Sequence, residues 1–226
     1  MMITNTVDLD SWDKVREWCN EHGSFKPTYL ELVNSQDFPK DAFSLGQIAS
    51  KFWLKNLLST VYPPITPNGT WALLGCWIGS LVPMLHDSFN IERLYGFDVD
   101  PDSVRKSEIF NRRYVENSWK YKGVVADVSM LSTNSMEFET SGELITVTPD
   151  VVINTSCEHM DTTWFETASN KQLIVMQTND SPDFDGHINT CESIQDMQSK
   201  YPLSKTLYAG SLRTPVYTRY MQIGYK

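Results

Sequence analysis

The stretch TWALLGCWIGS at residues 70–80 decides the fold of this chain, because an apolar run of strand-forming residues passes directly into two closely spaced glycines. A glycine turn between a strand and a helix lets backbone N–H groups approach a ligand closely. Taken alone, the turn supports a plain tight turn equally well, since glycine is common at strand ends. The ligand-binding interpretation makes Gly75, Cys76, Trp77 and Gly79 candidate residues for a nucleotide-like cofactor.

Downstream of this turn, short apolar runs alternate with segments long enough for crossover helices, a pattern typical of parallel sheets. Two final runs, residues 203–211 and 216–224, are joined by only Leu-Arg-Thr-Pro, which predicts a hairpin with an antiparallel last strand. We therefore predict an α/β fold with a doubly wound, mainly parallel seven-stranded sheet. The other predicted strands are 70–75, 93–98, 124–127, 150–155 and 172–178; the predicted helices are 79–89, 101–118, 160–169 and 189–200; the polar stretch 129–143 is predicted to be a loop.

Residues 1–69 have a different pattern and predict a helical N-terminal cap followed by a connector, in front of a single α/β domain at residues 70–226. Amphipathic segments at about 10–21, 28–34 and 45–61 precede a run rich in proline that ends at Gly69. The third segment carries Gln47, Ser50 and Lys51 on its polar face. Its apolar face fits core packing, while the polar cluster fits a lid over a binding crevice.

Acidic residues end the second and third predicted strands. Asp98, followed by Val99, lies about twenty residues past the glycine turn, where a carboxylate accepts hydrogen bonds from ribose hydroxyls. Asp127, followed by Val128, ends the third strand. Three consecutive strand ends therefore converge on one crevice, which favours an adenosine-containing ligand. The competing interpretation, that an acid only caps the helix starting at Pro101, applies better to Asp100 than to Asp98.

The fourth predicted strand ends in the polar run NTSCEHM at residues 154–160, the best catalytic candidate in the chain. Asn154 is predicted to contact the cofactor, and His159 to act as a general base with Glu158 orienting it or the substrate. An almost equally good alternative is that Glu158 and His159 anchor the following helix. By strand-end geometry, further polar residues are expected near the acceptor: Gln177, Asn179, Asp180, Tyr208, Arg213 and Arg219.

A metal is not predicted. Cys157, His159, His187 and Cys191 are of the right types for zinc, and the spacing from His187 to Cys191 is ligand-like, but the set is poorly specified by sequence. The four cysteines are widely separated and form no CxxC pair, so a disulfide framework has no support.

Composition narrows the class of protein. The net charge of −9 disfavours nucleic acid as a partner, because it repels a phosphate backbone. The sequence has no apolar run of the roughly 18 residues that a membrane span needs, and no signal-like start. We expect a cytoplasmic protein that is not in the membrane, and sequence gives no prediction of the oligomeric state.

Residues 70–226 resemble the class I S-adenosylmethionine-dependent methyltransferases, with their Rossmann-like domain, glycine turn, strand-end acids and terminal hairpin. The resemblance implies S-adenosylmethionine as cofactor: Gly75 and Gly79 line its methionine end, Asp98 holds the ribose, and Asp127 with Val128 frames the adenine. The polar run after the fourth strand is similar to enzymes of this family that act on small molecules. The whole chain is also similar to uncharacterised methyltransferase-like proteins of tailed phages.

Two positions depart from the family pattern. The acid usually found two residues before the first glycine is Leu73, and the middle glycine of the usual G-x-G-x-G is Trp77. Because tryptophan adopts a positive φ only at a cost, either the loop is reshaped or the indole forms a wall of the pocket.

Three functional hypotheses follow. The first is methyl transfer to an O or N atom of a small-molecule or peptide-borne acceptor. The second keeps the cofactor but transfers its aminocarboxypropyl group, motivated by the altered methionine end. The third is a binding or assembly module without catalysis, since the fold alone does not fix function.

Overall fold

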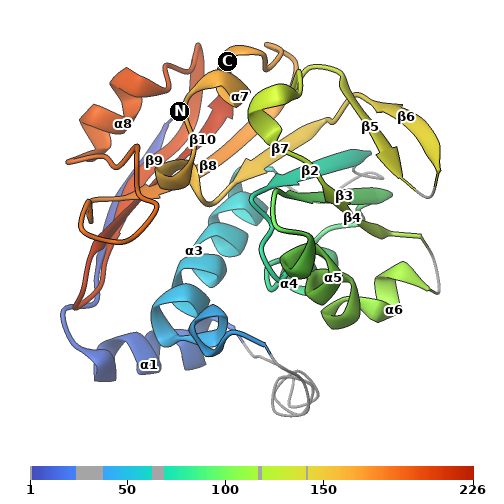
Figure 1. Ribbon diagram of the computed structural model, residues 1–226. Helices are drawn as coiled ribbons and strands as arrows, with labels where there is room; N and C mark the ends of the chain where they lie inside the picture. The colour runs from blue at the N-terminus through green and yellow to red at the C-terminus, as the bar shows by residue number, and fades with distance from the viewer. Residues whose placement is uncertain (1, 24–37, 63–68, 117–118, 141) are drawn as a thin grey trace.

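The chain is built around one eight-stranded sheet with the strand order β1-β9-β10-β8-β7-β2-β3-β4 (Figure 1). The computed structural model describes residues 2–23, 38–62, 69–116, 119–140 and 142–226. The strands of this sheet are β1 (Ile3–Asp8), β2 (Thr70–Leu74), β3 (Arg93–Asp98), β4 (Tyr121–Val125), β7 (Val151–Asn154), β8 (Leu173–Asn179), β9 (Lys205–Arg213) and β10 (Thr218–Tyr225).

Strand directions confirm the predicted fold class. The strands β4, β3, β2, β7 and β8 run parallel, and β10 is antiparallel to both of its neighbours, β8 and β9. The last strand is therefore inserted in the opposite direction between β8 and β9. All seven predicted strands are present, within a few residues of their predicted bounds.

An eighth strand corrects the predicted strand count and the purely helical N-terminal cap. Strand β1 pairs parallel to β9, with Ile3 opposite Tyr208 and Asp8 opposite Arg213. Residues 1–69 are thus joined to the sheet rather than lying outside it. The sequence ITNTVD gave no sign of this strand, because five of its six residues are exposed and the apolar alternation that marks a half-buried strand is missing.

Helices agree with the prediction most closely where an apolar face is long. The helix α3 (Leu45–Val61) has the predicted bounds, and α1 (Trp12–His22), α4 (Val82–Ser88) and α8 (Ile194–Lys200) lie within their predicted segments or shifted by one or two residues. The predicted helix 101–118 divides at Asn111 into α5 (Pro101–Phe110) and α6 (Arg112–Val115), and 160–169 holds only α7 (Thr163–Glu166). The amphipathic segment predicted at 28–34 lies outside the described residues.

The prediction of a loop at 129–143 was wrong. A short 3₁₀ helix, η2 (Val128–Met130), is followed by a separate antiparallel hairpin of β5 (Met136–Thr140) and β6 (Glu143–Val147). Met136 and Phe138 are buried on one face of this hairpin, against Tyr95 and Phe97 of the main sheet. The alternation of these apolar residues with glutamates was the signal for a strand.

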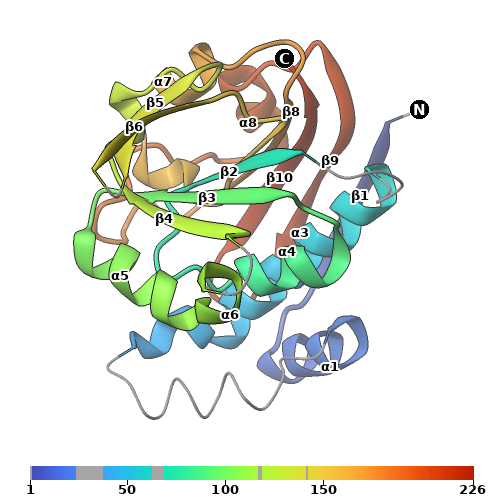
Figure 2. The ribbon, with the colours of Figure 1, turned by 90° about the vertical axis from the view of Figure 1, so that its right-hand side faces the viewer.

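The two largest hydrophobic cores lie on opposite faces of the sheet, and Figure 2 shows the helices that cover these faces. Helices α1, α3, α4, α5 and α6 lie on one face, and α7, α8 and the β5–β6 hairpin lie on the other. Successive side chains of β2 point to opposite faces of the sheet. Trp71 and Leu73 pack into the first core, and Ala72 and Leu74 pack into the second. The sheet is therefore doubly wound. None of the described helices is long and apolar enough to cross a membrane.

Candidate cofactor and acceptor site

A cavity of about 1080 Å³ opens at the carboxyl edge of the sheet. It lies where the strand order reverses, with β3 on one side of β2 and β7 on the other, which is where open α/β sheets bind ligands. Its lining comes from the loops after β2, β3, β4, β7 and β8, from the start of β10, and from α3. Because β10 is antiparallel, its first residues reach the same edge as the ends of the parallel strands.

The loop after β2 forms one wall. Gly75, Trp77 and Gly79 all have positive φ, at 61°, 48° and 67°. Tryptophan therefore does occupy the left-handed region, so the loop keeps the conformation that glycine would favour. The Trp77 N–H donates to Asp98 Oδ2 at 2.8 Å, which ties the loop to the end of β3. The half-buried indole lines the cavity.

Asp98 is half-buried, and both of its carboxylate oxygens accept backbone hydrogen bonds. Oδ2 accepts from Trp77, and Oδ1 accepts from the Asp100 N–H at 3.1 Å. An ionised carboxylate offers about four acceptor positions, so the side chain can accept further donors from the cavity. Asp100 caps α5, because its carboxylate accepts hydrogen bonds from the N–H groups of Asp102 and Ser103. This is the capping role that the sequence favoured for Asp100 over Asp98.

The third predicted acid lies further along the same wall. Asp127 is exposed and caps η2, accepting from the N–H of Ser129 at 3.0 Å and from its hydroxyl at 2.7 Å. Val128 beside it is buried. We call the wall formed by residues 75–77, 98–99 and 126–129 the glycine-loop side.

Most of the residues predicted to bind the cofactor meet at this wall, and two do not. Gly79 and Asn154 are not among the lining residues. A Cβ on Gly79 would lie 2.6 Å from Asn111 Nδ2, so this glycine faces α5. Asn154 is fully buried and accepts from the Ser156 N–H at 2.9 Å, which shapes its own loop. The predicted residues that do line the cavity are Gly75, Cys76, Trp77, Asp98, Val99, Asp127, Val128, Glu158 and His159.

Opposite the glycine-loop side, three side chains form a buried polar cluster, which we call the arginine side: Glu158, Asn179 and Arg219. Glu158 Oε1 accepts from Asn179 Nδ2 at 2.9 Å and from Arg219 Nη2 at 3.4 Å. Arg219 Nη1 donates to the Thr155 carbonyl at 2.9 Å. All three residues line the cavity and are at most 4% exposed.

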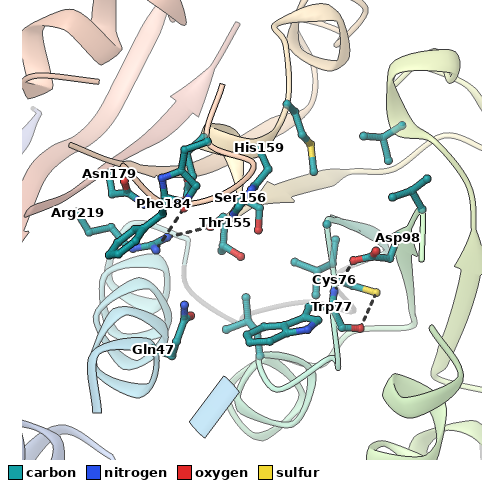
Figure 3. A pocket seen from close by; sticks show the side chains of 18 of the residues that line it. Gln47, Cys76, Trp77, Asp98, Thr155, Ser156, His159, Asn179, Phe184 and Arg219 are labelled. Carbon is teal, nitrogen blue, oxygen red and sulfur yellow. Dashed lines mark hydrogen bonds and ion pairs between the residues drawn. The ribbon is translucent and has the colours of Figure 1, made fainter. Parts of the chain in front are cut away.

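Two polar atoms of the arginine side have no partner. Glu158 Oε2 and Arg219 Nε are buried and make no hydrogen bond within the described residues. A buried polar atom without a partner costs roughly 1–3 kcal/mol, and more when its group is charged. Such atoms beside a cavity are the expected mark of a site that binds a polar ligand. Figure 3 shows the arginine side and the glycine-loop side facing each other across the cavity.

Two histidines lie next to this cluster. His159, in the short 3₁₀ helix η3 (Cys157–His159), packs edge-on against His187 with ring centroids 4.6 Å apart. Nδ1 of His159 lies 3.1 Å from the Gly186 carbonyl, and Nδ1 of His187 lies 2.6 Å from the Ser181 carbonyl. Since a carbonyl oxygen only accepts, Nδ1 of each ring carries a proton, and in the neutral form of either imidazole the lone pair lies on Nε2.

The first half of α3 provides the floor of the cavity. Gln47 and Lys51 line it, and Lys51 Nζ donates to Gln47 Oε1 at 2.8 Å. Burial, followed by the positive charge of Arg219, lowers the pKa of Lys51 to about 7. Ser50 points elsewhere and donates to Gln177 Oε1 in the core. The helix α3 therefore packs into the core and also forms the floor of the site.

The polar residues that strand-end geometry placed near the acceptor do not all line the cavity. Asn179 and Arg219 line the cavity, as expected, whereas Tyr208 packs against Trp53 in the core and Arg213 faces Asp8 at the surface. Sequence reasoning missed the apolar mouth, because its residues are scattered along the chain and no spacing unites them. Exposed apolar side chains lining this mouth are Trp12, Val99, Phe184, Ile188 and Val216.

The chain matches no protein-family model and no curated protein. Solved structures share its fold at low sequence identity. Magnesium protoporphyrin IX methyltransferase from Synechocystis PCC 6803, with bound SAH, has a TM-score of 0.57 at 12% identity, over 95% of each chain. The SAH-bound methyltransferase PaMTH1 of Podospora anserina has a TM-score of 0.55 at 15% identity, over 95% of this chain and 94% of that one.

A geranyl diphosphate methyltransferase in complex with SAM has a TM-score of 0.55 at 13% identity, over 80% of this chain and 86% of that one. At these identities the likeness establishes the fold alone. The fold is that of the class I S-adenosylmethionine-dependent methyltransferases, as predicted. The likeness to phage proteins stays a prediction.

Proposed function

We propose that the chain is an S-adenosylmethionine-dependent methyltransferase that methylates an O or N atom of a small-molecule or peptide-borne acceptor. The observation that carries this proposal is the two-sided cavity at the switch point of the sheet. One wall has the glycine loop and strand-end acids, and the other has buried polar side chains with unpartnered atoms. The fold shared with SAM-bound and SAH-bound methyltransferases supports it.

The residues of the glycine-loop side fit the cofactor. Asp98 retains acceptor capacity for the two ribose hydroxyls, Gly75 and Trp77 border the methionine end, and Asp127 with Val128 borders the adenine. Small-molecule sites usually span about 300–1,000 Å³, so a cavity of about 1080 Å³ has room for a cofactor and an acceptor together. The bound cofactor supplies an electrophilic sulfonium methyl group.

On the opposite wall, His159 and Glu158 are the candidate catalytic residues. His159 is held by the Gly186 carbonyl with its Nε2 lone pair free, so it can take the proton that an acceptor hydroxyl or amine loses. Glu158, fixed by Asn179 and Arg219, orients the acceptor. The apolar mouth, which includes Phe184 and Ile188, favours an acceptor with an apolar body and shields the reaction from water.

The first experiment is calorimetric titration with S-adenosylmethionine and S-adenosylhomocysteine. We expect both to bind the wild type, Asp98→Ala to lose binding, and Asp100→Ala to keep it. Asp100 is the matched control because it carries the same charge two residues away but only caps α5. Absence of binding by the wild type to either compound would overturn the proposal and favour the binding-module hypothesis.

Product analysis separates the two catalytic hypotheses. Methyl transfer releases S-adenosylhomocysteine, whereas aminocarboxypropyl transfer releases methylthioadenosine. We expect S-adenosylhomocysteine, and we expect Glu158→Gln combined with His159→Ala to abolish turnover while cofactor binding persists. Unchanged turnover in this double variant would remove both residues from the catalytic role.

A further inference from the structure

Three ligand-type side chains meet beside the cavity in a set that the sequence did not single out. Glu158, His159 and His187 each offer a ligand atom, and these atoms lie within 4.8 Å of one another. Cys157 and Cys191 are not in this group, although their residue types suit zinc and the sequence placed them with His159 and His187 as candidate ligands. The Cys157 thiol instead donates to the Asn154 carbonyl at 3.6 Å, and Cys191 is buried.

One carboxylate oxygen of Glu158 is held by hydrogen bonds, and the other is free to bind a ligand. Glu158 Oε1 is occupied by Asn179 and Arg219, while Oε2 is buried and unpartnered in a side chain only 2% exposed. A carboxylate that ligates a metal typically has its other oxygen hydrogen-bonded in this way. The orphaned Oε2 is thus explained if a cation binds it.

The imidazole rings of His159 and His187 are also each held by a hydrogen bond on one nitrogen. Each donates its Nδ1–H to a backbone carbonyl, His159 to Gly186 and His187 to Ser181, which leaves the Nε2 lone pairs for a ligand. Metal-binding histidines almost always have such a partner on the other ring nitrogen. The fixed tautomers would serve a proton acceptor too, but two adjacent rings prepared alike, beside an orphaned carboxylate oxygen, are better explained by a shared cation.

The backbone holds the three residues together from two distant parts of the chain. The N–H groups of Ile188 and Asn189 donate to the Glu158 carbonyl at 2.8 and 3.0 Å. Asn189 Nδ2 also donates to the Met160 carbonyl at 3.0 Å. The loop carrying His187 is therefore fastened to η3 before any ligand binds, so little ordering entropy opposes metal binding.

We propose that Glu158, His159 and His187 form a binding site for a first-row transition-metal dication of the Zn²⁺ type. Two imidazoles and one carboxylate suit Zn²⁺, Co²⁺ or Mn²⁺ better than Ca²⁺ or Mg²⁺, which require oxygen ligands. Three protein ligands leave a coordination position for a water or a substrate oxygen. If the proposed function also holds, a metal here would replace the general-base role proposed above for His159: it would bind the acceptor oxygen and lower its pKa, and the released proton would pass to solvent.

The test uses the full chain, stripped of metal and titrated with Zn²⁺ against a chromophoric chelator, with Co²⁺ spectroscopy in parallel. We expect one equivalent per chain. His187→Ala and Glu158→Gln should lose more affinity than Asn179→Ala, which removes only a hydrogen bond to a ligand and is expected to cost about 10–100-fold. His22→Ala is the control, since this exposed histidine stacks on Trp18 far from the trio in sequence.

Three outcomes would overturn the proposal, and the first two are no stoichiometric binding by the wild type and equal binding by the wild type and His187→Ala. A thiolate charge-transfer band with Co²⁺ would assign the ion to cysteines instead. Circular dichroism and S-adenosylhomocysteine binding of each variant separate loss of the metal site from loss of the fold. The metal titration itself uses neither cofactor nor acceptor, so its result does not depend on whether the proposed function holds.

Discussion

The two sides of the cavity hold their charges in different ways. On the glycine-loop side, Asp98 is half-buried and bonded to backbone N–H groups of Trp77 and Asp100. On the arginine side, Glu158 is almost fully buried and bonded to the side chains of Asn179 and Arg219. Backbone donors are present whatever the residue, so the first arrangement tolerates substitution of its neighbours. The second depends on the identity of each partner, and we expect it to be the more fragile.

The largest expected effect comes from breaking the buried ion pair. Arg219→Met leaves Glu158 buried without its counter-charge, and removing one partner of such a pair costs about 3–5 kcal/mol. Arg213→Met is the matched control, because Arg213 and Asp8 form an exposed pair at 3.9 Å, for which about 0–1 kcal/mol is typical. Urea unfolding measures both. Equal losses in the two variants would erase the difference between the two sides.

A double variant sharpens this result. In Glu158→Gln combined with Arg219→Met, neither charge of the pair remains, so the loss of unfolding free energy should be smaller than the sum of the two single losses. Strict additivity would mean that the two side chains stabilise the fold independently, contrary to the contact between them.

A moderate effect is expected at the glycine loop. Gly75→Ala forces alanine into φ of 61° and brings its Cβ within 2.7 Å of Met160 Cε. The left-handed conformation alone costs about 1–2 kcal/mol. Gly142→Ala has a similar φ of 79°, and among the described residues beyond its chain neighbours no atom lies within 4 Å of the new Cβ, so it reports the backbone cost alone. We expect Gly75→Ala to lose more unfolding free energy than Gly142→Ala; equal losses would show that Met160 moves away at no cost.

The floor between the two sides is expected to respond to pH. The folded-state pKa of Lys51, about 7, lies below the ordinary 10.5, so the unfolded chain binds more protons between these values. Stability therefore rises with pH through this window, by at most a little over 1 kcal/mol per pH unit, and the full cost of burial is present below pH 7. Unfolding of wild type and Lys51→Met from pH 7 to 9.5 isolates this contribution. Parallel curves would mean that Lys51 is solvated as an ordinary lysine.

The smallest effect is expected from two tryptophans with positive φ, Trp77 at 48° and Trp119 at 53°. Replacing either by glycine relieves about 1–2 kcal/mol of backbone strain but adds about 0.5–1 kcal/mol of chain entropy. Trp119→Gly, away from the cavity lining, should stay within about 1 kcal/mol of the wild type. Trp77→Gly should also weaken binding of S-adenosylhomocysteine, measured by calorimetry; unchanged affinity would exclude the indole from the cofactor wall.

The sequence predicted the part of the fold that is carried by periodicity. The buried strands β2, β7 and β8 begin with apolar runs, and α3 is a long, largely apolar segment, so these elements were placed closely. The strand β1 was missed because its side chains are exposed. The β5–β6 hairpin was missed because the glutamates that follow Met136 and Phe138 outweighed the alternation of these two apolar residues.

The candidate site was predictable to the level of strand ends and no further. Spacing placed Asp98 and Glu158 at the correct edge, but it did not show that Gly79 faces Asn111 or that Asn154 is enclosed in its own loop. The pairing of Arg219 with Glu158 depends on the register of β10, which sets Arg219 opposite Asn179. Register follows from packing of whole strands, and no local motif encodes it.

The strand β1 ties the first residues of the chain to nearly the last. Thr6 and Ser211 are 205 residues apart in sequence and hydrogen-bonded through their hydroxyls. At a synthesis rate of about 5–20 residues per second, the amino-terminal segment waits about 10–40 s on the ribosome before its partner strand exists. During that interval β1 has no partner strand, so a chaperone or rapid completion of translation would keep β1 from pairing with another chain.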